Sequence, residues 1–286
     1  MWIIYAFGSA LFAGLTAILA KCGIKNTDSN VATALRTIVV LCFSWVMVYV
    51  MQVQNELQFI DRKTLLFLIL SGISTGASWL CYFKALQLGD INKVTAIDKS
   101  STIMTMLLAV LLLGENMTIL KGIAILCIGG GTLLMIQQKP SEKTAWNKNP
   151  WLIYAMGSAI FASLTAILGK IGMENVNATL GTAIRTIVVL IMAWVVVFIT
   201  RKQGTIRQID MKSWLFLMLS GIATGASWLC YFKALQLGPA SVVVPIDKLS
   251  IVITIVFSYF VFKEKLSRKA SVGLLLLIGG TFLTLL

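Results

Sequence analysis

The chain has 286 residues, of which 58% are hydrophobic, 12% are charged and none is histidine. Soluble proteins carry about 25% charged residues, so this composition, with its mean hydropathy of +0.90, excludes an ordinary soluble domain and indicates a membrane protein. Without histidine there is no imidazole proton relay and no histidine metal site, and no cofactor is predicted. The net charge of +13 is typical of cationic cytoplasmic loops. It does not predict a nucleic-acid partner, because no long basic run is present.

An internal repeat organises the whole chain. Residue i resembles residue i + 149 without gaps from Trp2 to Ile136, and the run TGASWLCYFKALQLG is identical at 75–89 and 224–238. We therefore predict two homologous units, residues 1–137 and residues 151–286, joined by a polar linker at 138–150.

Each unit contains five apolar segments, and a membrane-spanning helix needs about 20 such residues. They lie near 2–20, 31–51, 64–87, 93–113 and 118–136, and again near 151–169, 177–199, 213–236, 240–262 and 268–286. Because five is odd, the second unit must enter the membrane from the opposite side. The predicted fold class is thus an all-α integral membrane protein with ten transmembrane helices in two inverted-topology five-helix repeats. Secondary transporters use this architecture, with the site at the repeat interface.

The distribution of Lys and Arg over the loops predicts the orientation. The odd-numbered loops hold 14 of these residues and the even-numbered loops hold 4. The positive-inside rule then places the odd-numbered loops in the cytoplasm and both termini outside.

Charged residues within the apolar segments are the candidates for function, because a charge at the bilayer centre costs from about 2.5 to over 10 kcal/mol. They form two repeat-related sets: Arg36, Lys84, Asp98 and Lys99 in the first unit, and Arg185, Lys233, Asp247 and Lys248 in the second. The helix rise of about 1.5 Å per residue places both aspartates close to mid-membrane. In one interpretation each Asp is a buried counter-ion for Arg or Lys while the lysines reach outward. In the other, the two sets line a shared cavity and each closes one mouth by ion pairing.

The third segment of each unit carries aromatic residues three to four positions apart, on one helical face near mid-membrane. These are Trp79 and Tyr82, repeated as Trp228 and Tyr231. Such a stripe either packs in the core or stacks on a substrate, and the sequence leaves both roles open.

Two other residues, near the fourth and ninth segments, have a predicted structural role. Pro245 lies two residues before Asp247, where the first unit has Ala96, and it predicts a kink in the ninth segment. Glu115 lies at the exit of the fourth segment and is interpreted as interfacial.

The chain resembles the EamA transporters of the drug/metabolite transporter superfamily over essentially its full length. The resemblance rests on an Arg in each second segment, on WLCYFKALQLG, and on AIDKSS…LLLGE with its counterpart PIDKLS…VFKE. It implies a ten-helix secondary transporter of the bacterial cytoplasmic (inner) membrane, often an exporter, with cytoplasmic termini. The implied substrates are amino acids, sugars, sugar phosphates or related metabolites. The implied site is central and here corresponds to Trp79, Tyr82, Asp98, Trp228, Tyr231 and Asp247.

The leading hypothesis is a secondary active transporter that exports a small polar metabolite by alternating access. Six cations against two acids in the spans favour an anionic or zwitterionic solute, and the two aspartates are the candidates for coupling to a proton; a counter-substrate is the other option. The expected partners are this solute and membrane lipid, and the chain is expected to act as a monomer that is internally a fused pseudo-dimer.

The alternative is a lipid-carrier or lipid-phosphate flippase of the same fold, since Lys and Arg near each membrane face could hold a lipid phosphate. An enzyme is disfavoured because the chain has no His and no GxSxG motif. A channel is disfavoured because two inverted copies of one charged set suit alternating gates better than a continuous pore.

Overall fold

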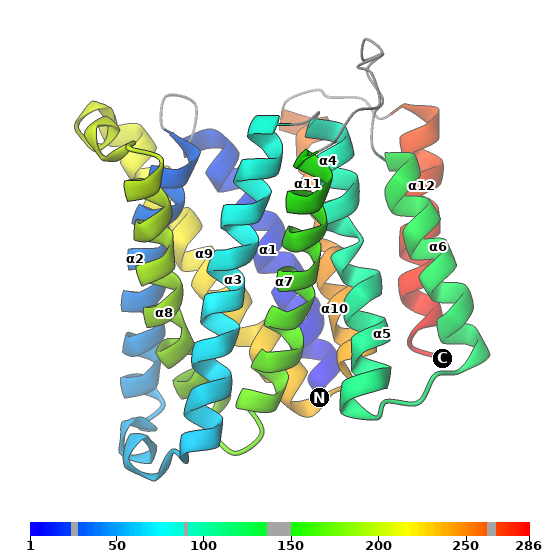
Figure 1. Ribbon diagram of the computed structural model, residues 1–286, viewed down its shortest axis with the longest axis horizontal. Coiled ribbons are helices and arrows are strands. Elements are labelled where there is room, and N and C mark those ends of the chain that lie inside the picture. The colour runs from blue at the N-terminus through cyan, green and yellow to red at the C-terminus, as the bar shows by residue number, and fades with distance from the viewer. Residues whose placement is uncertain (24–27, 89–90, 136–149, 262–266) are drawn as a thin grey trace.

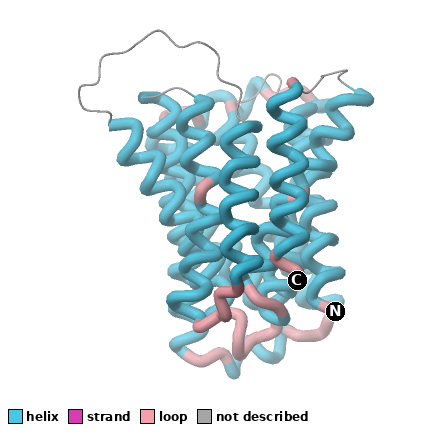
Figure 2. Tube along the Cα trace, turned by 90° about the vertical axis from the view of Figure 1, so that its right-hand side faces the viewer, coloured by secondary structure: helices cyan, strands magenta, loops and turns pink. Residues whose placement is uncertain are grey.

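The computed structural model describes residues 1–23, 28–88, 91–135, 150–261 and 267–286, and over these ranges it is helical with no strand. The linker predicted at 138–150 lies outside them except for Pro150. The long helices run side by side in one bundle, and both chain ends lie at the same end of it (Figures 1 and 2). We call this the terminus end. The opposite end, where α6 ends and α7 begins, is called the linker end.

The helices follow the predicted apolar segments closely. The first unit contains α1 (Trp2–Gly23), α2 (Ser29–Val50), α3 (Arg62–Leu88), α4 (Ile91–Lys99), α5 (Ser101–Leu113) and α6 (Ile119–Met135), with the short 3₁₀ helix η1 (Gln54–Phe59). The second unit contains α7 (Pro150–Gly172), α8 (Ala178–Ile199), α9 (Met211–Leu237), α10 (Ala240–Lys248), α11 (Ser250–Val261) and α12 (Arg268–Leu283), with η2 (Gln203–Gln208).

Polar side chains start several of these helices by satisfying N–H groups that have no partner within the helix. Asp28 accepts hydrogen bonds from the N–H groups of Asn30 and Val31 at the start of α2. Asp210 does the same for Ser213 at the start of α9. The hydrogen bonds from Ser213 hold the pKa of Asp210 below its usual range, so this cap is charged at neutral pH.

The fourth apolar segment of each unit is broken into two helices. The first unit breaks at Ser100, whose N–H bonds to the carbonyl of Ile97 at 3.0 Å, and the second breaks at Leu249, whose N–H bonds to that of Ile246 at 3.0 Å. Such i→i−3 bonds tighten the chain into a 3₁₀ turn. Because both units break at equivalent positions, although only the second has Pro245, the break does not depend on the proline.

Seven of the described helical segments are long and apolar enough to cross a membrane, and α6 is a shorter apolar helix. The structure is therefore that of a multi-pass membrane protein. The number falls below the predicted ten for two physical reasons. The break at Ser100 leaves α4 and α5 with 9 and 13 residues, and α6 and α12 have only 17 and 16.

The two units pack through swapped, repeat-related pairs of helices. Helix α1 packs against α9 and α3 packs against α7, while α2 faces α8 and α6 faces α12. Glycines allow close approach in both copies: a Cβ at Gly72 of α3 would lie 2.7 Å from the Cβ of Val188, and one at Gly221 of α9 would lie 2.6 Å from that of Val39. Each unit thus covers the third helix of the other.

Candidate functional site

The two aspartates lie at the interface between the units, next to serines. Ser158 of α7 donates a hydrogen bond to the Asp98 carboxylate at 2.7 Å, and Ser9 of α1 donates to the Asp247 carboxylate at 2.6 Å. Both serines are fully buried. Each aspartate is therefore held by the first helix of the other unit. Asp247 also has the ammonium group of Lys248 3.8 Å from its second oxygen.

The two arginines bind hydroxyl groups. Arg185 is only 1% exposed, and it donates to the hydroxyl of Thr75 at 2.8 Å. Its guanidinium carbon lies 5.3 Å from the ring centre of Trp228 and 4.2 Å from that of Phe232, and its Nε has no hydrogen-bond partner within the described part of the chain. Arg36 is half-buried and donates to Ser220 at 3.5 Å. Each arginine thus joins its own second helix to the third helix of the other unit.

A central cavity of about 260 Å³ lies between helices of both units. Three aromatic side chains and one Asp–Lys pair line it: Trp79, Trp228, Tyr231, Asp247 and Lys248. The hydroxyl groups of Thr75, Ser78, Thr165 and Ser227 add hydrogen-bonding capacity. Within the described residues no group of three or more His, Cys, Asp or Glu side chains could hold a metal ion. The cavity combines aromatic faces, hydroxyls and both signs of charge, which are the groups that bind a small polar solute.

A larger cavity of about 550 Å³ shares Ala13 and Lys248 with the central one. It brings together the repeat-related lysines Lys99 and Lys248 and five hydroxyl side chains: Thr95, Thr102, Thr132, Ser250 and Thr254. The cavity reaches Met135, the last residue of α6, which places it on the linker side of the bundle. Of the eight predicted charged residues, Lys99, Asp247 and Lys248 line one or both of these two cavities.

The remaining residues of the predicted site, Asp98 included, line neither of these two cavities. Lys84 is exposed. Lys233 donates to Gln236 at 2.9 Å and lines a separate pocket of about 250 Å³ beside α2 and α8. The hydroxyl of Tyr82 lies 3.5 Å from that of Thr95. Arg185 contacts Thr75 and Trp228, which line the central cavity, but its own side chain does not line it. The two four-residue charged sets therefore do not form two compact clusters.

The serines that hold the two aspartates were not among the residues predicted from the sequence. Ser9 and Ser158 are repeat-related and occupy the same place in FGSALF and MGSAIF, so the repeat was the available signal. Single serines are common in membrane helices, and only their distance to an aspartate reveals their role. Glu115 was interpreted as interfacial; its carboxylate also binds the start of α10 in the other unit at 2.6 and 3.0 Å, which the sequence did not predict.

The model of the EamA-like transporter family matches residues 1–137 and 149–286. The chain belongs to the EamA-like transporter family. Over 133 residues this EamA chain is 43% identical to an "Uncharacterized transporter in cobO 3'region" of Sinorhizobium sp., a match that spans 46% of the chain and 94% of that protein. The resemblance inferred from sequence is confirmed, and the chain is a multi-pass membrane transporter. Family membership and the relative's name point to transport, not catalysis.

A solved structure titled "Crystal structure of protein" has the same fold. It superposes with a TM-score of 0.80, covers 100% of the EamA chain and 98% of its own chain, and is 15% identical in sequence. At this identity the likeness concerns the fold alone.

Proposed function

We propose that this protein is a secondary active transporter that exports a small polar, anionic or zwitterionic, metabolite across the bacterial cytoplasmic membrane by alternating access. One observation carries the proposal. The repeat-related lysines Lys99 and Lys248, one from each unit, line the same cavity, and Asp247 lines the adjoining one. A solute between the units would therefore contact equivalent groups from both, which is the arrangement that inverted-repeat transporters use.

The proposed topology has ten crossings in two inverted five-helix repeats. The broken pairs α4–α5 and α10–α11 each form one crossing. Helix α6 has 17 residues and, at about 1.5 Å per residue, a length of about 26 Å, close to the hydrocarbon thickness of about 30 Å. One observation supports the inversion: α1 starts at the terminus end and α7 at the linker end (Figure 1). The match to 94% of the Sinorhizobium relative covers only 46% of this chain, so that protein has about the length of one unit. On this proposal the chain is a monomer with an internal pseudo-two-fold axis.

A thermal-shift screen of the purified protein against organic acids, phosphorylated metabolites and zwitterions tests the proposal. A ligand that binds only the folded state stabilises it by about 2.7 kcal/mol at one hundred times its Kd. The variants Asp247→Asn and Lys248→Gln should weaken the binding of a hit by about tenfold to a hundredfold, because a charge-assisted hydrogen bond contributes about 1.5–3 kcal/mol. Lys233→Gln is the matched control, since Lys233 lines neither cavity, and it should leave the shift unchanged.

If the hit raises the unfolding temperature of all three variants equally, the proposed site is refuted. One observation favours the alternative, a lipid-phosphate flippase: apolar side chains such as Ile128, Ile251 and Leu277 also line the larger cavity. The screen therefore includes short-chain lipid phosphates. Stabilisation by these, and by no water-soluble metabolite, would replace the metabolite proposal with the flippase.

A further inference from the structure

A carboxylate of the first unit holds the start of a helix in the second unit at the terminus end. Gly114 ends α5 with φ of 66°, a left-handed conformation that suits glycine, and the chain then turns so that Glu115 faces α10. One carboxylate oxygen of Glu115 accepts the N–H of Ala240 at 2.6 Å and the other accepts the N–H of Ser241 at 3.0 Å. These N–H groups belong to the first turn of α10, where no intrahelical partner exists.

Lys170, in the last turn of α7, completes this contact. Its ammonium group lies 3.5 Å from a Glu115 oxygen and also donates to the carbonyl of Gly238, just after α9. The side chains of Lys170 and Glu115 are only 18% and 10% exposed. A second inter-unit bond lies beside them, because Lys121 donates to the hydroxyl of Ser241 at 3.0 Å. Glu115 therefore ties together the ends of α7, α9 and α10, all from the other unit.

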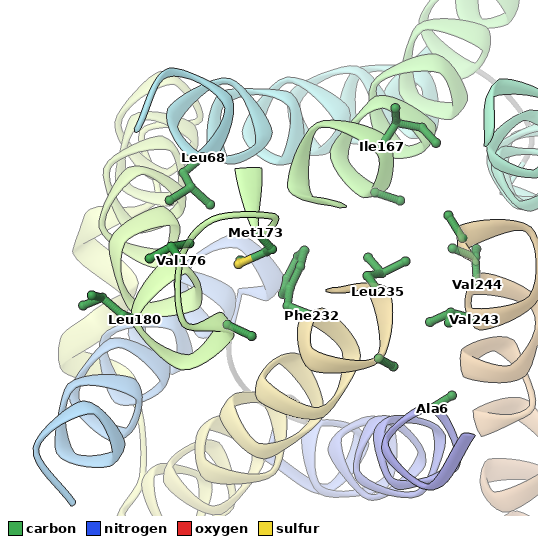
Figure 3. Packing of buried hydrophobic residues seen from close by; sticks show 14 of the residues in the cluster. Ala6, Leu68, Ile167, Met173, Val176, Leu180, Phe232, Leu235, Val243 and Val244 are labelled. Atoms are coloured by element: carbon green, nitrogen blue, oxygen red, sulfur yellow. The ribbon is translucent and has the colours of Figure 1, made fainter. Parts of the chain in front are cut away.

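Directly behind this contact, α10 runs from the terminus end to the residues that line the central cavity. Residues 240–246 are buried along their whole length, and we call them the α10 plug. Five of them, Ala240, Val242, Val243, Val244 and Ile246, belong to the same apolar cluster as Ala6, Ile167 and Leu235. Figure 3 shows Val243 and Val244 facing these side chains. The next two residues, Asp247 and Lys248, already line the central cavity. Between that cavity and the terminus end, the interface is thus packed with apolar side chains and fastened at its outer edge by charge.

We propose that Glu115 and Lys170 form an inter-unit latch that keeps the terminus-end mouth closed by holding the α10 plug in place. The proposal rests on the alternating access of the proposed function, in which this mouth must open once per cycle. A charged contact at the membrane edge suits a reversible closure, because water can solvate the separated charges there. The apolar side chains of the plug exclude water but do not fix the position of α10 along its axis. The latch fixes that position, because it binds the first turn of α10 to the other unit.

Hydrogen–deuterium exchange of the full chain in lipid nanodiscs, measured by mass spectrometry without any substrate, tests the latch. In Glu115→Ala, amides of the plug and of the last two turns of α7 should exchange about tenfold to a hundredfold faster than in the wild type, as expected for the loss of charge-assisted hydrogen bonds. Lys170→Gln should give a smaller rise in the same two regions, because the bonds from Ala240 and Ser241 remain.

Glu56→Gln is the matched control. Glu56 also accepts an inter-unit backbone bond, from the N–H of Asn177 at 3.3 Å, but it has no contact with the plug. Its exchange pattern should match that of the wild type. A rise confined to Ala240 and Ser241 would overturn the latch, because it would show a simple helix cap. No rise at all, or an equal rise in α2 and α6, would overturn it too.

The exchange experiment separates the latch from the transport proposal. Faster exchange of the plug without any binding hit would keep the latch and leave the metabolite assignment unsupported. A binding hit with unchanged exchange in Glu115→Ala would keep the transporter and reject the latch.

Discussion

The crossing of α6 and α12 depends on glycines, and one substitution tests this with a control on the neighbouring residue. A Cβ at Gly131 would lie 2.5 Å from the carbonyl oxygen of Gly273 and 2.8 Å from the backbone nitrogen of Leu277. A Cβ at Gly130 would have no heavy atom within 4 Å. Gly131→Ala and Gly130→Ala therefore change the same helix by the same methyl group, and only the first meets the other unit.

The expected loss of stability in Gly131→Ala follows from these distances. A carbon normally approaches a carbonyl oxygen no closer than about 3.3 Å, so Gly131→Ala requires the two backbones to separate by about 0.8 Å. No rotamer change can relieve this clash, since the opposing atoms are backbone. Overpacking of this kind costs about 1–3 kcal/mol. Replacing Gly by Ala within a helix gains about 1 kcal/mol, but it does so in both variants, and the comparison between them isolates the clash.

Thermal unfolding followed by tryptophan fluorescence in detergent measures the difference. Gly130→Ala should unfold at the wild-type temperature or slightly above it, and Gly131→Ala should unfold several degrees below Gly130→Ala. If the two variants unfold at the same temperature, the close packing of α6 on α12 is not what holds these helices together, and the reasoning from the glycines fails.

Three further predictions, which use five substitutions, test contacts between or within the units by the same unfolding assay. Ser9→Ala should destabilise the protein by about 1–3 kcal/mol, since it leaves the Asp247 carboxylate without its 2.6 Å donor; an unchanged unfolding temperature would contradict this bond. Arg185→Lys should destabilise it more than Arg36→Lys, because Arg185 is buried and stacked on two rings while Arg36 is half-buried with a bond of 3.5 Å; the reverse order would contradict the burial argument. Asp28→Ala should cost about 1 kcal/mol through loss of the α2 cap, and Asp28→Asn, which can still cap, should restore most of it.

The helices and the two units could be predicted from the sequence because hydropathy and the repeat are properties of the chain in one dimension. The break at Ser100 could not, because no glycine or proline lies near it. In the second unit Pro245 predicted a kink, and the break lies four residues further on, at Leu249. The charged residues of the site were predictable, because a charge within an apolar segment can be recognised from the sequence alone. Their partners come from the other unit, as Ser158 does for Asp98 at 2.7 Å, and no local pattern predicts which helices will meet.

Positions where the two units differ matter more for the mechanism than positions where they agree. The plug sequence ASVVVPI corresponds to INKVTAI in α4. Val244 is buried in the apolar cluster of the plug, whereas its equivalent Thr95 lines the larger cavity. Burying a valine side chain away from water is favourable by about 1.5–3 kcal/mol, and a threonine that faces a cavity makes no such contribution. The helix that precedes the break is therefore an apolar plug in the second unit, whereas in the first unit it contributes to a polar cavity lining. Under the proposed alternating access, the two ends would be unequal, and this difference would favour the conformation in which the terminus end is closed.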